Sequence, residues 1–186
     1  MRPSETALAR VLAHTEWAIV WSYRAMTHGK TSVSWWGTTA PVTLATGTTA
    51  IWAGIHMEFA VPGRVFGFRL FRDGSYDGNG WAIFWNYDTF ETHCATRFKV
   101  AKTPPSTWHQ TWIHPTVRVA VGTGYGLDII FPNGKFYRTN SALGSHVTHN
   151  NIIFFAGRTT TLLVPVSHAP TENTNAYGVD VLFSPD

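Results

Sequence analysis

The chain has 186 residues, of which 44% are hydrophobic and only 13% are charged, so it can bury a core and lacks the composition of a disordered protein. Its net charge of +3 comes from scattered basic residues. Since no Lys/Arg cluster follows the pattern of a nucleic-acid-binding surface, we expect no nucleic-acid partner. The length favours one compact domain, or one domain with an appendage.

The N-terminal residues predict one long amphipathic helix over Ser4–His28. Ser4 can cap its start, and Gly29 is a natural stop at its C-terminal end. Apolar residues recur at the i, i+3, i+4 spacing of a helix face. The residues expected to anchor this helix in an assembly are Leu8, Val11, Leu12, Trp17, Ile19, Val20 and Trp21. Charged residues interrupt every apolar run, so we expect neither a signal peptide nor a membrane-spanning segment.

After Lys30 the sequence becomes rich in Thr, Gly and aromatic residues, and we expect no second helix. We interpret 1–30 as the helix, 31–50 as a linker or first strand, and 51–186 as a β-domain. The clearest predicted strands are Ile51–Val61, Arg64–Arg72, Trp81–Tyr87, His93–Ala101, Val117–Val121, Tyr125–Phe131, Asn151–Phe155 and Gly178–Phe183. Short strands at this spacing predict an antiparallel β-sandwich of jelly-roll type, so the expected fold class is all-β with one long N-terminal α-helix.

Several motifs follow one another in an order that is known from other proteins. The segments concerned are Gly54–Phe71, Asn79–Trp85, Thr107–Gln110, Pro115–Val117, Tyr125–Tyr137 and Tyr177–Phe183. The last of them, Tyr-Gly-Val-Asp-Val-Leu-Phe, matches a closing Tyr-x-Val-Asp-Val-x-Phe pattern. Over about Leu44 to Phe183 the chain resembles a bacterial β-sandwich family of unknown function. That family accompanies immunoglobulin-like and carbohydrate-binding modules in large secreted and surface proteins.

The resemblance implies a sandwich fold and a binding or spacer module displayed outside cells, with no catalytic residues to carry over. An external module without an export signal is typical of phage virion components, which are made in the host cytoplasm. We therefore expect a virion location. The expected partners are other capsid or tail subunits, further copies of this chain, and in one alternative a glycan of the host surface.

The segment Phe71–Asp88 contains oxygen-bearing side chains at every second position, as a calcium loop does. These residues are Asp73, Ser75, Asp77 and Asn79. The loop lacks the bidentate Glu of a helix–loop–helix calcium site, since the twelfth position is Phe84. Glycines and Asp/Asn residues also suit a turn between two strands. We favour the turn, and we expect no metal and no cofactor.

Aromatic residues are the remaining candidates for a site. Trp108 and Trp112, four residues apart, form a candidate platform for stacking sugars, and Trp35 and Trp36 form a second candidate. Packing inside the protein or between subunits is the alternative role for both pairs.

No catalytic motif accompanies these residues. The chain has no Gly-x-Ser-x-Gly elbow, and its 11 acidic residues lie mostly in turns. We therefore expect a non-enzymatic phage structural protein, a capsid decoration or minor tail protein. The alternative is a carbohydrate-binding adhesin module that recognises host-surface glycans.

Overall fold

The computed structural model describes residues 33–72, 79–99, 107–143, 146–160 and 171–186, which all belong to one compact unit, Val33–Asp186. Thirteen strands lie in these residues. The first seven are β1 (Thr43–Thr46), β2 (Ile51–Phe59), β3 (Gly63–Arg72), β4 (Asn79–Asn86), β5 (Thr92–Lys99), β6 (Thr107–Val119) and β7 (Tyr125–Phe131). The others are β8 (Lys135–Thr139), β9 (Val147–His149), β10 (Ile152–Thr160), β11 (Thr171–Asn173), β12 (Ala176–Tyr177) and β13 (Val179–Pro185).

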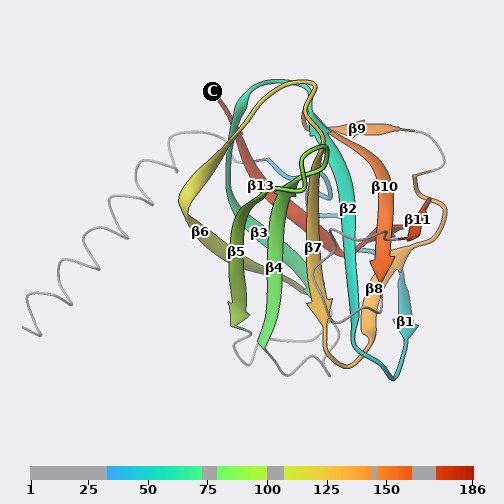
Figure 1. Ribbon diagram of the computed structural model, residues 1–186. Helices are drawn as coiled ribbons and strands as arrows, with labels where there is room; N and C mark the ends of the chain where they lie inside the picture. The colour runs from blue at the N-terminus through green and yellow to red at the C-terminus, as the bar shows by residue number, and fades with distance from the viewer. Residues whose placement is uncertain (1–32, 73–78, 100–106, 144–145, 161–170) are drawn as a thin grey trace, which may run out of the picture. The chain divides into compact units, whose positions relative to one another are not determined.

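The strands form one large and two small antiparallel sheets. The large sheet has the order β11-β10-β2-β7-β4-β5, and β9 pairs with the first part of β10 beside β11. The small sheets have the orders β13-β3-β6 and β1-β8-β12. In Figure 1, strands β5, β4, β7, β2 and β10 lie side by side, and β13, β3 and β6 form a second layer behind them. The architecture is therefore sandwich-like.

The core lies between these layers because apolar side chains alternate along the strands. From β2, the side chains of Ala53, Ile55, Met57 and Phe59 are fully buried on the inner face. Across the core, strands β3 and β13 contribute a matching row of buried side chains. These are Val65, Phe68, Leu70, Val179, Val181 and Phe183. Each such side chain contributes about 1.5–3 kcal/mol by leaving water.

The β-sandwich-like, all-β character predicted from the sequence is confirmed. The full predicted fold class, which adds one long N-terminal α-helix to a jelly roll, is wrong for the part of the chain that the structure describes. These residues form strands in three antiparallel sheets and no helix. The core of the described residues consists mainly of side chains from the strands, with Trp36 among its buried residues. The predicted helix and its seven anchor residues lie outside the described residues.

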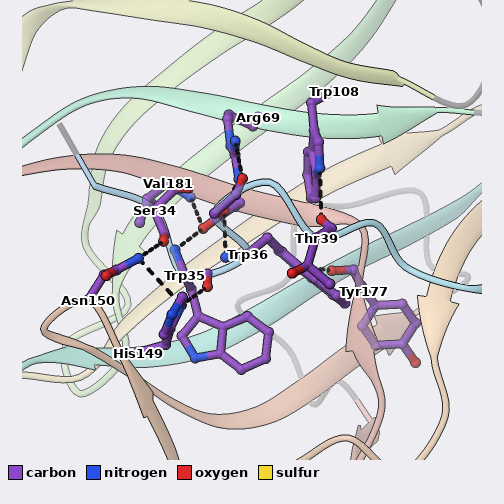
Figure 2. A network of polar contacts seen from close by, with 12 residues as sticks. Ser34, Trp35, Trp36, Thr39, Arg69, Trp108, His149, Asn150, Tyr177 and Val181 are labelled. Carbon is purple, nitrogen blue, oxygen red and sulfur yellow. Dashed lines mark hydrogen bonds and ion pairs between the residues drawn. The ribbon is translucent and has the colours of Figure 1, made fainter.

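The segment 33–39, which precedes β1, is attached to the sandwich by a buried carboxylate. Figure 2 shows the network of polar contacts around this segment. Asp180 in β13 is fully buried and accepts the backbone N–H groups of Trp35 and Trp36, both at 3.1 Å. Its Oδ2 also pairs with Nη2 of Arg69 in β3 at 2.7 Å, and Arg69 Nη1 donates to the Gly37 carbonyl at 2.8 Å. One carboxylate thus holds two strands and the preceding segment together.

Further polar contacts fix the same segment from both sides. The indole N–H of Trp36 donates to the Tyr177 carbonyl at 3.0 Å. Asn150 donates to the Ser34 carbonyl at 2.8 Å, and Val33 forms an antiparallel bridge with Phe183. Residues 31–50, interpreted from the sequence as a linker or a first strand, therefore include both a tightly bound segment and β1.

We expect Asp180→Asn to lower the free energy of unfolding by about 3–5 kcal/mol, because it leaves the Arg69 charge buried without its partner. Urea denaturation monitored by tryptophan fluorescence measures the change. The matched control is Arg118→Ala, which breaks the exposed Arg118–Asp186 pair at 3.3 Å and is expected to change stability by less than about 0.5 kcal/mol. A similar small loss in both variants would contradict the role given to Asp180.

Candidate functional site

A second group of apolar side chains lies on the outer face of the large sheet, away from the core. Trp52 in β2 and Trp85 in β4 are buried there, at 5% and 3% exposure. Ile83, Tyr87 and Ile130 pack against them. Because side chains alternate along a strand, these residues point away from the core that their neighbours Ala53 and Phe84 line. We call this group the outer cluster.

Two charged residues, Asp128 and Arg158, lie beside the outer cluster on the two strands that flank Gly54. Gly54 in β2 pairs with Arg158 in β10 on one side and with Asp128 in β7 on the other. A Cβ atom at Gly54 would lie 2.2 Å from Oδ1 of Asp128. The Asp128 carboxyl group therefore occupies space that a side chain at Gly54 would fill. Asp128 and Arg158 are both only 1% exposed.

A second glycine, Gly126, makes room for the Trp85 indole. Gly126 in β7 lies between His56 in β2 and Trp85 in β4. A Cβ atom at this position would lie 2.3 Å from Cε2 of Trp85, so the indole covers the glycine backbone. In this position Nε1 of Trp85 donates a 2.6 Å hydrogen bond to Oδ2 of Asp128.

The guanidinium of Arg158 lies against two aromatic rings. Its Cζ is 4.5 Å from the centre of the Trp85 ring and 4.8 Å from that of Tyr87. These are cation–π distances. Nε and Nη1 of Arg158 are buried and have no hydrogen-bond partner among the described residues. A buried donor without an acceptor costs free energy, which makes this group a candidate for ligand contact.

Tyr87, His56 and Glu172 lie at the outer edge of this group. The Tyr87 hydroxyl donates to Oε1 of Glu172 in β11, and Nδ1 of His56 is 3.7 Å from the same oxygen. The rings of His56 and Tyr87 stack with centres 3.7 Å apart and planes at 3°. Glu172 is the cross-strand partner of Arg158, so the β10–β11 pairing places it next to Arg158.

The pKa values of these groups are shifted, mainly by burial. Burial raises the pKa of Asp128 to about 6, although the Arg158 charge and the Trp85 hydrogen bond oppose the rise. Burial, with the hydrogen bond to Glu172, raises the pKa of Tyr87 to about 12. Burial lowers the pKa of His56 and that of Arg158. A cluster of shifted groups on one face is typical of a functional site.

Two exposed aromatic rings lie on the same face of the large sheet. Phe90, in the turn after β4, is 53% exposed and stacks on Trp85 at 5.8 Å between ring centres. Its φ of 59° is unusual for a residue other than glycine, and Asn86 stabilises the turn by accepting the N–H groups of Asp88 and Thr89. Trp81, at the start of β4, is 41% exposed with Arg97 over its ring. We call Trp81, Tyr87, Phe90 and the charged group around Arg158 the outer face.

Three of the four tryptophans predicted as sugar platforms take part in attaching segment 33–39. Trp36 is 5% exposed. Trp35 is half-buried, stacks on Phe154 at 4.4 Å and donates its indole N–H to the Val147 carbonyl at 3.1 Å. Trp108 donates to the Thr39 carbonyl at 3.0 Å and lies under the Arg69 guanidinium (Figure 2).

Trp112 lies apart from the other three. It is 44% exposed and stacks on Phe66 at 5.5 Å. The structure thus joins Trp35, Trp36 and Trp108 in one packed group, and a sugar platform at Trp108 and Trp112 stays a prediction.

The predicted calcium loop falls mostly outside the described residues. Asp73, Ser75 and Asp77 are not among them, and Asn79 begins β4. In the residues that the structure describes, no three His, Cys, Asp or Glu side chains are grouped so that they could hold a metal ion. These residues also contain no helix of the length and hydropathy that a membrane span requires.

The sequence did not single out Asp128 or Arg158. Each stands alone in an apolar strand, in Tyr-Gly-Leu-Asp-Ile-Ile-Phe and in Ile-Ile-Phe-Phe-Ala-Gly-Arg. A lone charge in a strand that is apolar on both faces is a usable signal, because burying it requires a partner.

We expect Asp128→Asn to change how stability depends on pH. The folded protein holds the Asp128 proton more tightly than the unfolded chain, so protonation stabilises the fold. The free energy of unfolding of the native protein, relative to that of Asp128→Asn, should fall by up to about 1.4 kcal/mol per pH unit between about pH 4 and 6 and be constant above. Chemical denaturation of both proteins across this range measures the difference. Parallel stability curves would contradict a raised Asp128 pKa.

Comparison with known proteins does not add a family to these observations. No family model matches the chain, and no curated protein matches it. The resemblance to the bacterial β-sandwich family stays a prediction.

Proposed function

We propose that the protein is a non-enzymatic carbohydrate-binding module that holds its ligand on the outer face. The observation that carries this proposal is the combination of exposed aromatic rings with the buried, incompletely bonded Arg158 guanidinium on one side of the large sheet. Flat aromatic rings pack against the apolar C–H faces of sugar rings, and polar side chains between them bond the hydroxyl groups.

The arrangement of the outer face supports binding over catalysis. Asp128 has a pKa near 6, which suits proton transfer, but its side chain is 1% exposed and accepts the Trp85 indole N–H. A general acid or base has to come within hydrogen-bond reach of its substrate. Phe90 and Trp81, in contrast, are open to solvent.

The phage virion assignment, as a decoration or minor tail protein, stays a prediction from the sequence, as does assembly with other copies. A carbohydrate-binding face agrees with the alternative function predicted from the sequence, which is the recognition of host-surface glycans. The proposed site differs from the one predicted for that function, since it uses β4, β7, β10 and β11.

Phe90→Gly is a variant suited to testing the site. It removes an exposed ring and relieves the positive φ at that position, so the fold is not expected to lose stability. We expect it to weaken glycan binding about tenfold or more on a glycan array and in affinity electrophoresis, in line with the loss of one aromatic contact. Thermal unfolding of the same preparation verifies the fold.

The comparison variant is Trp112→Ala, which removes a similarly exposed ring from β6, in the small sheet β13-β3-β6. Binding that persists in Trp112→Ala and weakens in Phe90→Gly supports the outer face. The opposite pattern would favour the platform predicted from the sequence and reject the site proposed here. If the native protein binds no glycan on the array, the proposed function is wrong.

A further inference from the structure

Arg158 is the group on the outer face whose bonding is least complete. We propose that Arg158 is an anion subsite that receives the carboxylate of an acidic sugar, such as a uronic acid. This proposal rests on the carbohydrate-binding function proposed above and specifies the class of ligand. In this arrangement the aromatic rings contact the sugar ring, and the Arg158 guanidinium binds the charged substituent of that sugar.

The geometry of Arg158 suits this role. The buried Trp85 ring holds the guanidinium at cation–π distance before a ligand arrives. Two of its three nitrogens have no acceptor among the described residues. Carboxylate oxygens are strong acceptors for guanidinium N–H groups, and a bond between the two charged groups is stronger than one between neutral groups.

The protein's own carboxylates do not complete the bonding of Arg158. Asp128 accepts the Trp85 indole, and Glu172 accepts the Tyr87 hydroxyl. Glu172 is 44% exposed in its side chain and lies opposite Arg158 across the β10–β11 pairing. A carboxylate of the protein therefore already lies at the outer edge of the subsite, where a ligand carboxylate would compete with it.

Access to the guanidinium requires the Tyr87 side chain to move. Arg158 is 1% exposed, and the half-buried Tyr87 ring covers it. Tyr87 is held by its bond to Glu172 and by stacking on His56. A side-chain rotation on binding is common at recognition sites, and here it would replace the Tyr87–Glu172 contact with a contact between ligand and Arg158.

The charges around the subsite make its occupancy depend on pH. Asp128 is faced by Arg158 from β10, and His56 is faced by Glu172, Arg158, Asp88 and His146. Acidification from pH 7 to pH 5 protonates Asp128, whose pKa is about 6, and so removes a negative charge near Arg158. The site becomes more positive, so an acidic ligand, which stays ionised, should bind more tightly at pH 5.

The test compares short oligogalacturonides with their methyl esters, which differ in charge and share the sugar rings. We expect the native protein to bind the acid about tenfold or more tightly than the ester in calorimetric titration. Arg158→Met should bind both forms equally, and Arg158→Lys should show an intermediate preference because it keeps the charge and loses the planar donor group. Arg118→Ala, which removes an exposed cation from β6, should keep the native preference.

Glu172→Gln supplies a test in the opposite direction that leaves the buried groups in place. Removing this competing carboxylate should raise the affinity for the acid several-fold and leave the affinity for the ester unchanged. Equal binding of acid and ester by the native protein, or a preference that survives in Arg158→Met, would overturn the subsite while the proposed function stands. Absence of binding to any glycan on the array would instead overturn the proposed function.

Discussion

The buried carboxylate of Asp180 is the constraint on which the rest of the structure depends. Its four donors come from Trp35, Trp36, Arg69 and the adjacent Val181 backbone, so the last strand, β3 and the segment before β1 share one acceptor group. A carboxylate in the interior is stable only when such donors replace water. These donors come from distant parts of the chain. Their bonds to Asp180 therefore also hold Trp36 in the core and Val33 beside Phe183.

Asp128 is a second buried aspartate, in a different environment. It is equally buried but accepts an indole N–H, and Arg158 acts on it as a neighbouring charge. Asp180, by contrast, has a direct 2.7 Å ion pair with Arg69. Both guanidinium groups lie over aromatic rings, but Arg69 gives two of its nitrogens to oxygen acceptors, whereas Nε and Nη1 of Arg158 have no acceptor among the described residues. The first pair therefore serves the fold, and the second keeps bonding capacity that a ligand can use.

The elements that the sequence predicted well are those with local signals. The predicted range Tyr125–Phe131 coincides with β7, and each of the eight predicted strand ranges overlaps an observed strand. The short strands β9, β11 and β12 have two or three residues each and depend on a partner strand, so no local pattern predicts them. Strand β6 begins at Thr107, ten residues before its predicted start.

The site was harder to predict because strand pairing creates it. Asp128 and Arg158 are thirty positions apart in the sequence, and they become neighbours only through the register of β2 between them. The prediction of aromatic platforms used residue type and spacing, which cannot tell that the Trp36 and Trp108 N–H groups bond to carbonyls within the fold. A single charged residue in an apolar strand carries information that becomes useful only when its neighbour on the next strand is known.

Gly54 and Gly126 have a consequence for how such a face can change during evolution. Any larger residue at either position would collide with Asp128 or Trp85, so the floor of the outer face tolerates little variation. Phe90 and Glu172 lie at its rim, in a turn and in a short edge strand, where substitution leaves the core untouched. Related chains with different ligands would then share both glycines and diverge at the rim, so that new specificities arise without rebuilding the sheet.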